Sequence, residues 1–112
     1  MRIHLLDDDT LVHDTWKLAS EIEGNELKSY YTLSEFVNEN VPITEWIFVD
    51  FQLNPSLDKA HIVALIQKGY RHVIITTGSI LKAKDIPSEI YQVIGKEYPL
   101  ELVKKLKMPL PI

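Results

Sequence analysis

The regular alternation of short apolar segments with amphipathic segments constrains the fold of this chain more than any other feature. Residues 3–6 (IHLL) have the composition of a buried strand, and apolar residues then recur at helical spacing over residues 11–22, before a stop at Gly24. The same order of strand and then helix is repeated along the chain. Because parallel strands need long crossover connections, usually helices, this pattern predicts an α/β fold.

Short runs of apolar and β-branched residues predict four more strands, over residues 27–31, 46–49, 72–77 and 91–94. The third run, WIFV, has no polar interruption, as expected of a parallel strand that is covered on both faces. Helices are predicted from the capping-box spacing at residues 32–35 to about residue 40, around residues 62–66, and over residues 100–107. Each predicted strand before the last is thus followed by a segment long enough to cross over the sheet.

The segment 79–89 contains Pro87 and few apolar residues, so the fourth helix is expected to be shortened or irregular. With right-handed crossovers, the pattern predicts a flavodoxin-like doubly wound sheet of five parallel strands in the order 2-1-3-4-5, with helices on both faces. The length of 112 residues suits one domain, which we expect over residues 1–107. Residues 108–112 would form a C-terminal tail or the start of a linker.

Composition narrows the range of partners and of cellular locations. The formal net charge of −4 argues against binding to nucleic acid or to an anionic membrane, because both need a basic surface. The chain has no cysteine, which excludes disulfides and thiolate metal sites. The N-terminal apolar run is too short to cross a membrane. We therefore expect a cytoplasmic protein whose partners are other proteins.

Polar residues suited to phosphate chemistry stand at the carboxyl ends of four predicted strands. They are Asp7 and Asp8 after the first strand, Asp50 after the third, Thr77 at the end of the fourth and Lys96 after the fifth. Because functional groups of doubly wound sheets gather at the carboxyl ends of the strands, we expect these five residues to lie together.

Three neighbouring carboxylates repel one another unless a cation lies between them. Oxygen ligands without histidine or thiolate favour Mg²⁺, with Mn²⁺ as an alternative. The ammonium of Lys96 and the hydroxyl of Thr77 would each contact a phosphoryl oxygen. This set of groups is typical of phosphoryl transfer, in which the protein mainly positions the reactants and neutralises charge.

From about residue 2 to residue 107, the sequence resembles the receiver domains of response regulators in two-component signal transduction. The resemblance rests on the pair Asp7-Asp8, on Asp50, on Thr77 followed by Gly78, and on Lys96, in the order and near the spacings of that family. It implies that Asp50 is the phosphoacceptor, with Thr77 and Lys96 assisting.

The resemblance also implies the ligands of the metal, the partners and the type of activity. Asp8 and Asp50 would bind the metal directly, Asp7 through water, and Gln52 through its backbone carbonyl. The phosphodonor would be a histidine kinase or a histidine phosphotransfer protein. The domain would be a signalling phosphoacceptor rather than an enzyme, although it would assist its own phosphorylation and dephosphorylation. Phosphorylation would change its conformation to control a downstream protein target, and the resemblance allows a homodimer in the phosphorylated state.

Three departures from the family affect the readout of the signal more than its chemistry. Glu97 follows Lys96 where the family usually has proline, and Val93 stands where the family usually has an aromatic switch residue. The loop after Asp50 has Pro55 but apparently one extra residue and no glycine.

Two alternatives remain open from the sequence. A degenerate receiver would bind a partner protein without being phosphorylated. A haloacid-dehalogenase-type phosphatase would also use a strand-end aspartate, a lysine and magnesium, but Leu11 stands where that family has Thr or Val, and Asp50 would be unexplained. The four histidines show no shared ligand spacing and are assigned no function, and Trp16 and Trp46 are interpreted as packing residues.

Overall fold

The structure is a computed structural model that describes residues 1–53, 59–79, 81 and 83–107. Its elements alternate as predicted. In order they are β1 (Arg2–Leu6), α1 (Thr10–Ile22), β2 (Glu26–Tyr30), α2 (Leu33–Asn38), β3 (Trp46–Asp50), α3 (Ala60–Gln67), β4 (Val73–Thr76), a 3₁₀ turn (Ala83–Asp85), β5 (Gln92–Ile94) and α4 (Leu100–Lys107). Among these described elements no helix is long and apolar enough to cross a membrane.

The five strands form one parallel sheet in the order β2-β1-β3-β4-β5, which confirms the predicted topology. The register sets the carboxyl ends of neighbouring strands beside one another. Leu6 at the end of β1 pairs with Val49, and Asp50 at the end of β3 pairs with Thr76, which in turn pairs with Ile94. Residues that follow these strand ends therefore start from one edge of the sheet.

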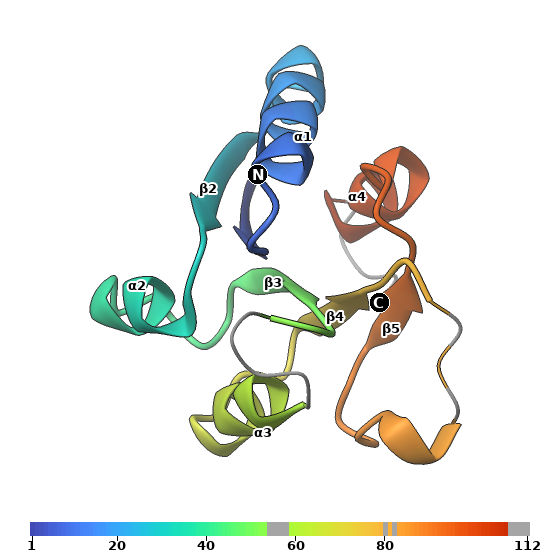
Figure 1. Cartoon of the computed structure of the whole chain (residues 1–112). Coiled ribbons are helices and arrows are strands. Elements are labelled where there is room, and N and C mark those ends of the chain that lie inside the picture. Colours follow the sequence, from blue (N-terminus) through green and yellow to red (C-terminus); the bar gives the residue numbers. More distant parts are fainter. Residues whose placement is uncertain (54–58, 80, 82, 108–112) are drawn as a thin grey trace, which may run out of the picture.

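The two faces of the sheet carry two separate apolar clusters, and helices cover each face (Figure 1). Helices α1 and α4 cover one face, where Trp16 and Val103 pack with the strand residues of that side. Helices α2 and α3 cover the other face. The alternation of side chains along β3 divides its residues between the faces: Phe48 belongs to the first cluster, whereas Ile47 and Val49 belong to the second. The uninterrupted apolar run of β3 is thus explained by cover on both sides.

Local sequence signals begin and end the helices as expected. Asp9 is the N-cap of α1, and its side chain accepts a hydrogen bond from the backbone N–H of Leu11 at 2.9 Å. Thr32 caps α2 by accepting from the N–H of Glu35 at 3.1 Å. Gly24 has a φ of 73°, a left-handed conformation that glycine adopts without strain, directly after the end of α1.

Between β4 and β5, the part that the structure describes has a single 3₁₀ turn, Ala83–Asp85. This agrees with the shortened or irregular helix that the sequence predicted over residues 79–89, which is a different segment from α4. The fourth strand is shorter than predicted, so that His72 and Thr77 flank β4 rather than belong to it. The fifth strand likewise begins one residue later than predicted. Pro55 and the tail 108–112, for which the sequence raised expectations, lie outside the described residues.

Shortening a side chain in the sheet should show how tightly the core is packed. Ile74 is fully buried in the centre of β4, so Ile74→Val is expected to lower the free energy of unfolding by about 0.5–1.5 kcal/mol, measured by chemical denaturation. Ile43 is 52% exposed, and Ile43→Val is the matched control, with an expected change near zero. Equal losses for the two variants would contradict the description of the core.

Candidate functional site

Three carboxylates meet at the carboxyl edge of the sheet. Asp7 follows β1 and is fully buried, Asp50 ends β3 and is 7% exposed, and Asp8 is exposed at the surface. Each offers one oxygen, and these oxygens all lie within 4.8 Å of one another. The pairing of β1 with β3 explains the arrangement, because it sets the two strand ends side by side. The three acidic residues predicted to bind metal are thus brought together, in a cluster of a size that suits one cation.

Lys96 supplies the positive charge within this cluster. Its ammonium nitrogen lies 2.7 Å from Asp7 Oδ2 and 2.7 Å from Asp50 Oδ1. The lysine comes from the loop after β5, so its side chain reaches past β4 to the ends of β3 and β1. One ammonium therefore bridges the two buried carboxylates, while three carboxylates share the site.

Backbone N–H groups hold both buried carboxylates in place. Asp7 Oδ1 accepts a hydrogen bond from the N–H of Asp9 at 2.8 Å, and Asp50 Oδ1 accepts one from the N–H of Gln52 at 3.2 Å. In each case the donor lies two residues after the aspartate, the local turn that aspartate favours where a strand ends. Gln52 is therefore beside the site, but a role for its carbonyl as a metal ligand stays a prediction.

Opposing effects act on the carboxyl group of Asp50. Burial raises the pKa of Asp50 above its ordinary value, and the charge of Asp7 acts in the same direction. The hydrogen bond and the charge of Lys96 and the N–H of Gln52 lower the pKa of Asp50, but by less than burial raises it. The ionised form of this carboxylate is therefore disfavoured in the folded protein, and any further cation at the cluster would stabilise it.

Thr77 lies at the same edge of the sheet, outside the ion pairs that Lys96 forms with Asp7 and Asp50. It follows β4 directly, its N–H donates to the carbonyl of Ile94 at 3.0 Å, and its hydroxyl oxygen accepts from the N–H of Ser79 at 3.1 Å. The preceding Thr76 is fully buried, with a hydroxyl that has no hydrogen-bond partner among the described residues. Of the two threonines, Thr77 is the one that solvent and ligands can reach.

Beside the cluster, Lys96 lines a surface depression of about 470 Å³. Its lining includes Thr77 and Gly78 from the β4 end and the loop residues Lys96 and Glu97. The lysine side chain is 29% exposed, whereas the Asp7 side chain beneath it has no exposure. Thr77 and Lys96 thus share one surface depression, which places a hydroxyl-bearing and an ammonium-bearing residue side by side.

Three aromatic residues contact the site in ways that the sequence did not indicate. A ring nitrogen of His13 lies against the backbone carbonyl of Asp7, and one of His61 against that of Asp50. Trp16, which was expected only to pack, donates its indole N–H to the carbonyl of Lys96. Their positions on the buried faces of α1 and α3 were the available signal, since a histidine at a buried helical position needs a polar partner.

Comparison with known proteins gives matches by structure but not by sequence. No protein-family model and no curated protein matches the chain. Response regulator protein TrrA from Thermotoga maritima, in complex with Mg²⁺ and BeF, superposes with a TM-score of 0.72 at 20% identity, over 95% of this chain and 96% of TrrA. A CheY-like receiver domain protein from Methanospirillum hungatei has a TM-score of 0.72 at 23% identity, over 95% of this chain and 90% of the other.

A third similar structure comes from a multidomain protein. The N-terminal domain of a response regulator/sensory box/GGDEF protein from Carboxydothermus hydrogenoformans has a TM-score of 0.70 at 16% identity, over 95% of this chain and 90% of that one. These similarities cover nearly the whole chain and agree with the observed strand order. The chain therefore has the fold of the CheY-like receiver domains of response regulators.

Proposed function

We propose that this chain is a phosphoacceptor receiver domain of a two-component phosphorelay. A histidine kinase or a histidine phosphotransfer protein phosphorylates Asp50 in a reaction that depends on Mg²⁺, and the phosphorylated domain changes conformation to control a protein target. The observation that carries the proposal is the ammonium of Lys96 at 2.7 Å from both Asp7 and Asp50, within a cluster that includes Asp8, on a receiver fold.

The chemistry of the transfer assigns a separate task to each side chain. A carboxylate oxygen of Asp50 attacks the phosphorus, the P–N bond to the donor imidazole breaks, and an acyl phosphate forms. Lys96 is placed to neutralise one phosphoryl oxygen, and the hydroxyl of Thr77 to donate a hydrogen bond to another. With these groups in position, the protein needs no further covalent participant.

The donor set fits a hard divalent cation. It consists of carboxylate oxygens, and one ammonium is present for the three carboxylates of Asp7, Asp8 and Asp50. A bound Mg²⁺ or Mn²⁺ would supply charge neutralisation to the phosphoryl oxygens. The presence of Mg²⁺ in the TrrA structure supports the choice of magnesium for this chain.

The same proposal describes the regulation and the setting of the domain. It is a signalling phosphoacceptor that assists its own dephosphorylation, and it acts in the cytoplasm with protein partners only. The phosphoryl group shifts an equilibrium between two conformations. Since Val93 has no ring to reorient, this shift is read through other residues at the β4–β5 edge.

Phosphorylation by a small donor tests the function directly. Incubation with acetyl phosphate and Mg²⁺ is expected to give a phosphoryl adduct, seen by intact-mass spectrometry, that is labile to hydroxylamine because it is an acyl phosphate. The adduct should be absent without Mg²⁺ and absent in Asp50→Asn. Asp14→Asn, an exposed aspartate of α1, is the control and should behave as the wild type. An adduct that persists in Asp50→Asn would exclude Asp50 as the acceptor. If the wild type forms no adduct with acetyl phosphate or with a phosphohistidine donor, a binding module without phosphorylation would be favoured.

The raised pKa of Asp50 predicts how stability changes with pH in the metal-free protein. Because the folded state holds this proton more tightly than the unfolded chain, the contribution of Asp50 to stability falls as pH rises from the ordinary carboxyl range through the raised pKa. Asp50→Asn lacks this titration, so its melting temperature in EDTA should match that of the wild type in the ordinary carboxyl range, near about pH 4, and exceed it at neutral pH. Asp14→Asn should show no such trend, and an Asp50→Asn variant less stable than the wild type at neutral pH would contradict the prediction.

Magnesium should stabilise the folded protein through the acidic cluster. At a Mg²⁺ concentration about 100 times the dissociation constant, binding adds about 2.7 kcal/mol to the free energy of unfolding, which raises the melting temperature. Asp8→Asn removes one carboxylate of the cluster and should lose most of this increase, whereas Asp14→Asn should retain it. An unchanged increase in Asp8→Asn would place magnesium elsewhere on the protein.

A further inference from the structure

Two buried histidines contact the backbone of the two buried aspartates of the site. His13 Nε2 lies 2.6 Å from the carbonyl oxygen of Asp7, and His61 Nε2 lies 2.6 Å from the carbonyl oxygen of Asp50. Because a carbonyl oxygen can only accept, each imidazole must donate from Nε2. The contact therefore fixes the tautomer of both rings, with the proton on Nε2.

Both imidazoles are buried, and the carbonyl contact gives a hydrogen-bond partner to Nε2 of each ring. His13 is 4% exposed and His61 is 5% exposed, and the Nδ1 atom of each has no hydrogen-bond partner among the described residues. Burying an unpaired ring nitrogen is unfavourable, and an apolar side chain would avoid that cost at either position. Packing alone does not explain a histidine at these places, whereas a donor to a strand-end carbonyl does.

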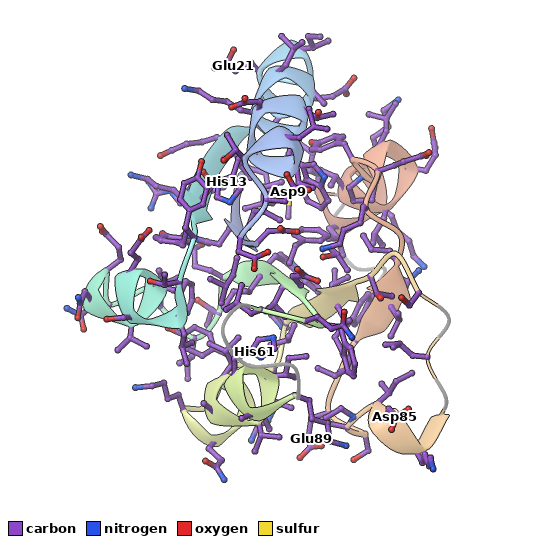
Figure 2. The ribbon with its side chains drawn as sticks, in the orientation of Figure 1. Asp9, His13, Glu21, His61, Asp85 and Glu89 are labelled. Carbon is purple, nitrogen blue, oxygen red and sulfur yellow. The ribbon has the colours of Figure 1, made fainter. Side chains whose placement is uncertain are left out.

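The two histidines approach the sheet from opposite faces. His13 belongs to α1, which packs on the same face as α4, and His61 belongs to α3, which packs on the other face. Figure 2 shows both rings on the sides of their helices that are turned toward the middle of the molecule. Asp7 is thus contacted by a histidine from one face of the sheet and Asp50 by a histidine from the other face, near the carboxyl ends of β1 and β3.

The third charged member of the site is held by a similar contact. The indole N–H of Trp16 donates to the backbone carbonyl of Lys96 at 2.8 Å. Trp16 is fully buried, and its ring meets those of Phe48 and Tyr98 edge to face at centroid distances of 5.1 and 5.5 Å. The loop that carries Lys96 is therefore fixed to a side chain that is itself rigidly packed.

We propose that His13, His61 and Trp16 are positioning residues of the phosphorylation site. Their ring N–H groups hold the main chain of Asp7, Asp50 and Lys96, respectively, so that two carboxylates and one ammonium keep the spacing that metal binding and phosphoryl transfer require. The inference rests on the proposed function for its consequence, but the contacts themselves do not depend on it.

Such contacts are needed because the carboxylates repel one another and because small displacements of reacting groups lower reaction rates. The carboxylates repel one another, and Asp50 and Asp7 stand at strand ends where the backbone has fewer ladder bonds. The carbonyl and the side chain of one residue are attached to the same Cα, so a contact that holds the carbonyl restrains the main chain from which the carboxylate projects. Small displacements of reacting groups lower rates steeply, by up to about 100-fold for about 1 Å.

Substitution of His61 tests the proposal. His61→Leu removes the donor while keeping an apolar side chain of similar bulk, and His61→Gln keeps an N–H close to the position of Nε2. Magnesium affinity by calorimetry and the rate of phosphorylation by acetyl phosphate are measured at a temperature at which each variant is folded. We expect His61→Leu to lose about 10-fold in Mg²⁺ affinity and His61→Gln to recover most of it, as for groups that orient metal ligands elsewhere.

Two controls remove the same kind of contact far from the site. Tyr70 is buried and donates its hydroxyl hydrogen to the carbonyl of Val41, and His72 has Nδ1 2.9 Å from the carbonyl of Thr44, before the amino end of β3. Tyr70→Phe and His72→Leu should lower stability without changing Mg²⁺ affinity. If either control lowers Mg²⁺ affinity as much as His61→Leu, or if His61→Leu retains wild-type affinity, the positioning role is wrong.

A readout without metal separates this inference from the proposed function. In the metal-free protein, the ¹⁵N resonance of the Lys96 ammonium reports its contact with Asp7 and Asp50. His61→Leu should shift this resonance, His61→Gln should largely restore it, and Tyr70→Phe should leave it unchanged. If the wild type neither binds Mg²⁺ nor forms an adduct, the proposed function fails, and the Lys96 resonance still decides the positioning role. A resonance that His61→Leu leaves in place would overturn that role.

Discussion

The repulsion among Asp7, Asp8 and Asp50 is the constraint around which the carboxyl edge of this sheet is arranged. Two of these carboxylates are buried, and the ammonium of Lys96 contacts both of them at 2.7 Å. Burial raises the pKa of Asp50, and the charge of Asp7 acts in the same direction, although the contacts with Lys96 partly oppose this rise. The folded protein therefore keeps three carboxylates close together at this edge, and a bound cation would stabilise their ionised forms. Such local instability is common where a protein performs chemistry.

The rest of the fold supplies the rigidity that holds these charges together. The central strands are covered on both faces, and the ends of β1 and β3 are fixed relative to each other by their ladder. Periodicity in the sequence was sufficient to predict this architecture, because uninterrupted runs such as residues 46–49 are compatible with few arrangements other than a parallel sheet between two helical layers. The rule that functional groups gather at the carboxyl ends of strands then predicted that Asp7, Asp50 and Lys96 would lie together, as they do in the structure.

Other parts of the site depend on tertiary contacts that a sequence does not encode locally. The contacts of His13, His61 and Trp16 could not be predicted from the sequence. Which carbonyl each ring nitrogen reaches depends on how α1 and α3 pack on the sheet. The end of β4 was also misplaced by one residue. Two consecutive threonines offer the same strand propensity, and only pairing with Asp50 and Ile94 fixes Thr76 as the last strand residue.

The alternation of side chains along β3 has a consequence for how this strand can evolve. Phe48 and Asp50 are two residues apart and so project toward the same face, where Phe48 packs edge to face on Trp16. A shift of β3 by one residue relative to its neighbouring strands would turn both side chains to the opposite face at once. The aromatic packing and the direction of the Asp50 carboxylate therefore depend on one strand register. A chain that keeps the packing of Phe48 therefore also keeps the direction of the Asp50 carboxylate, so that selection for a stable fold preserves the geometry of the acidic cluster.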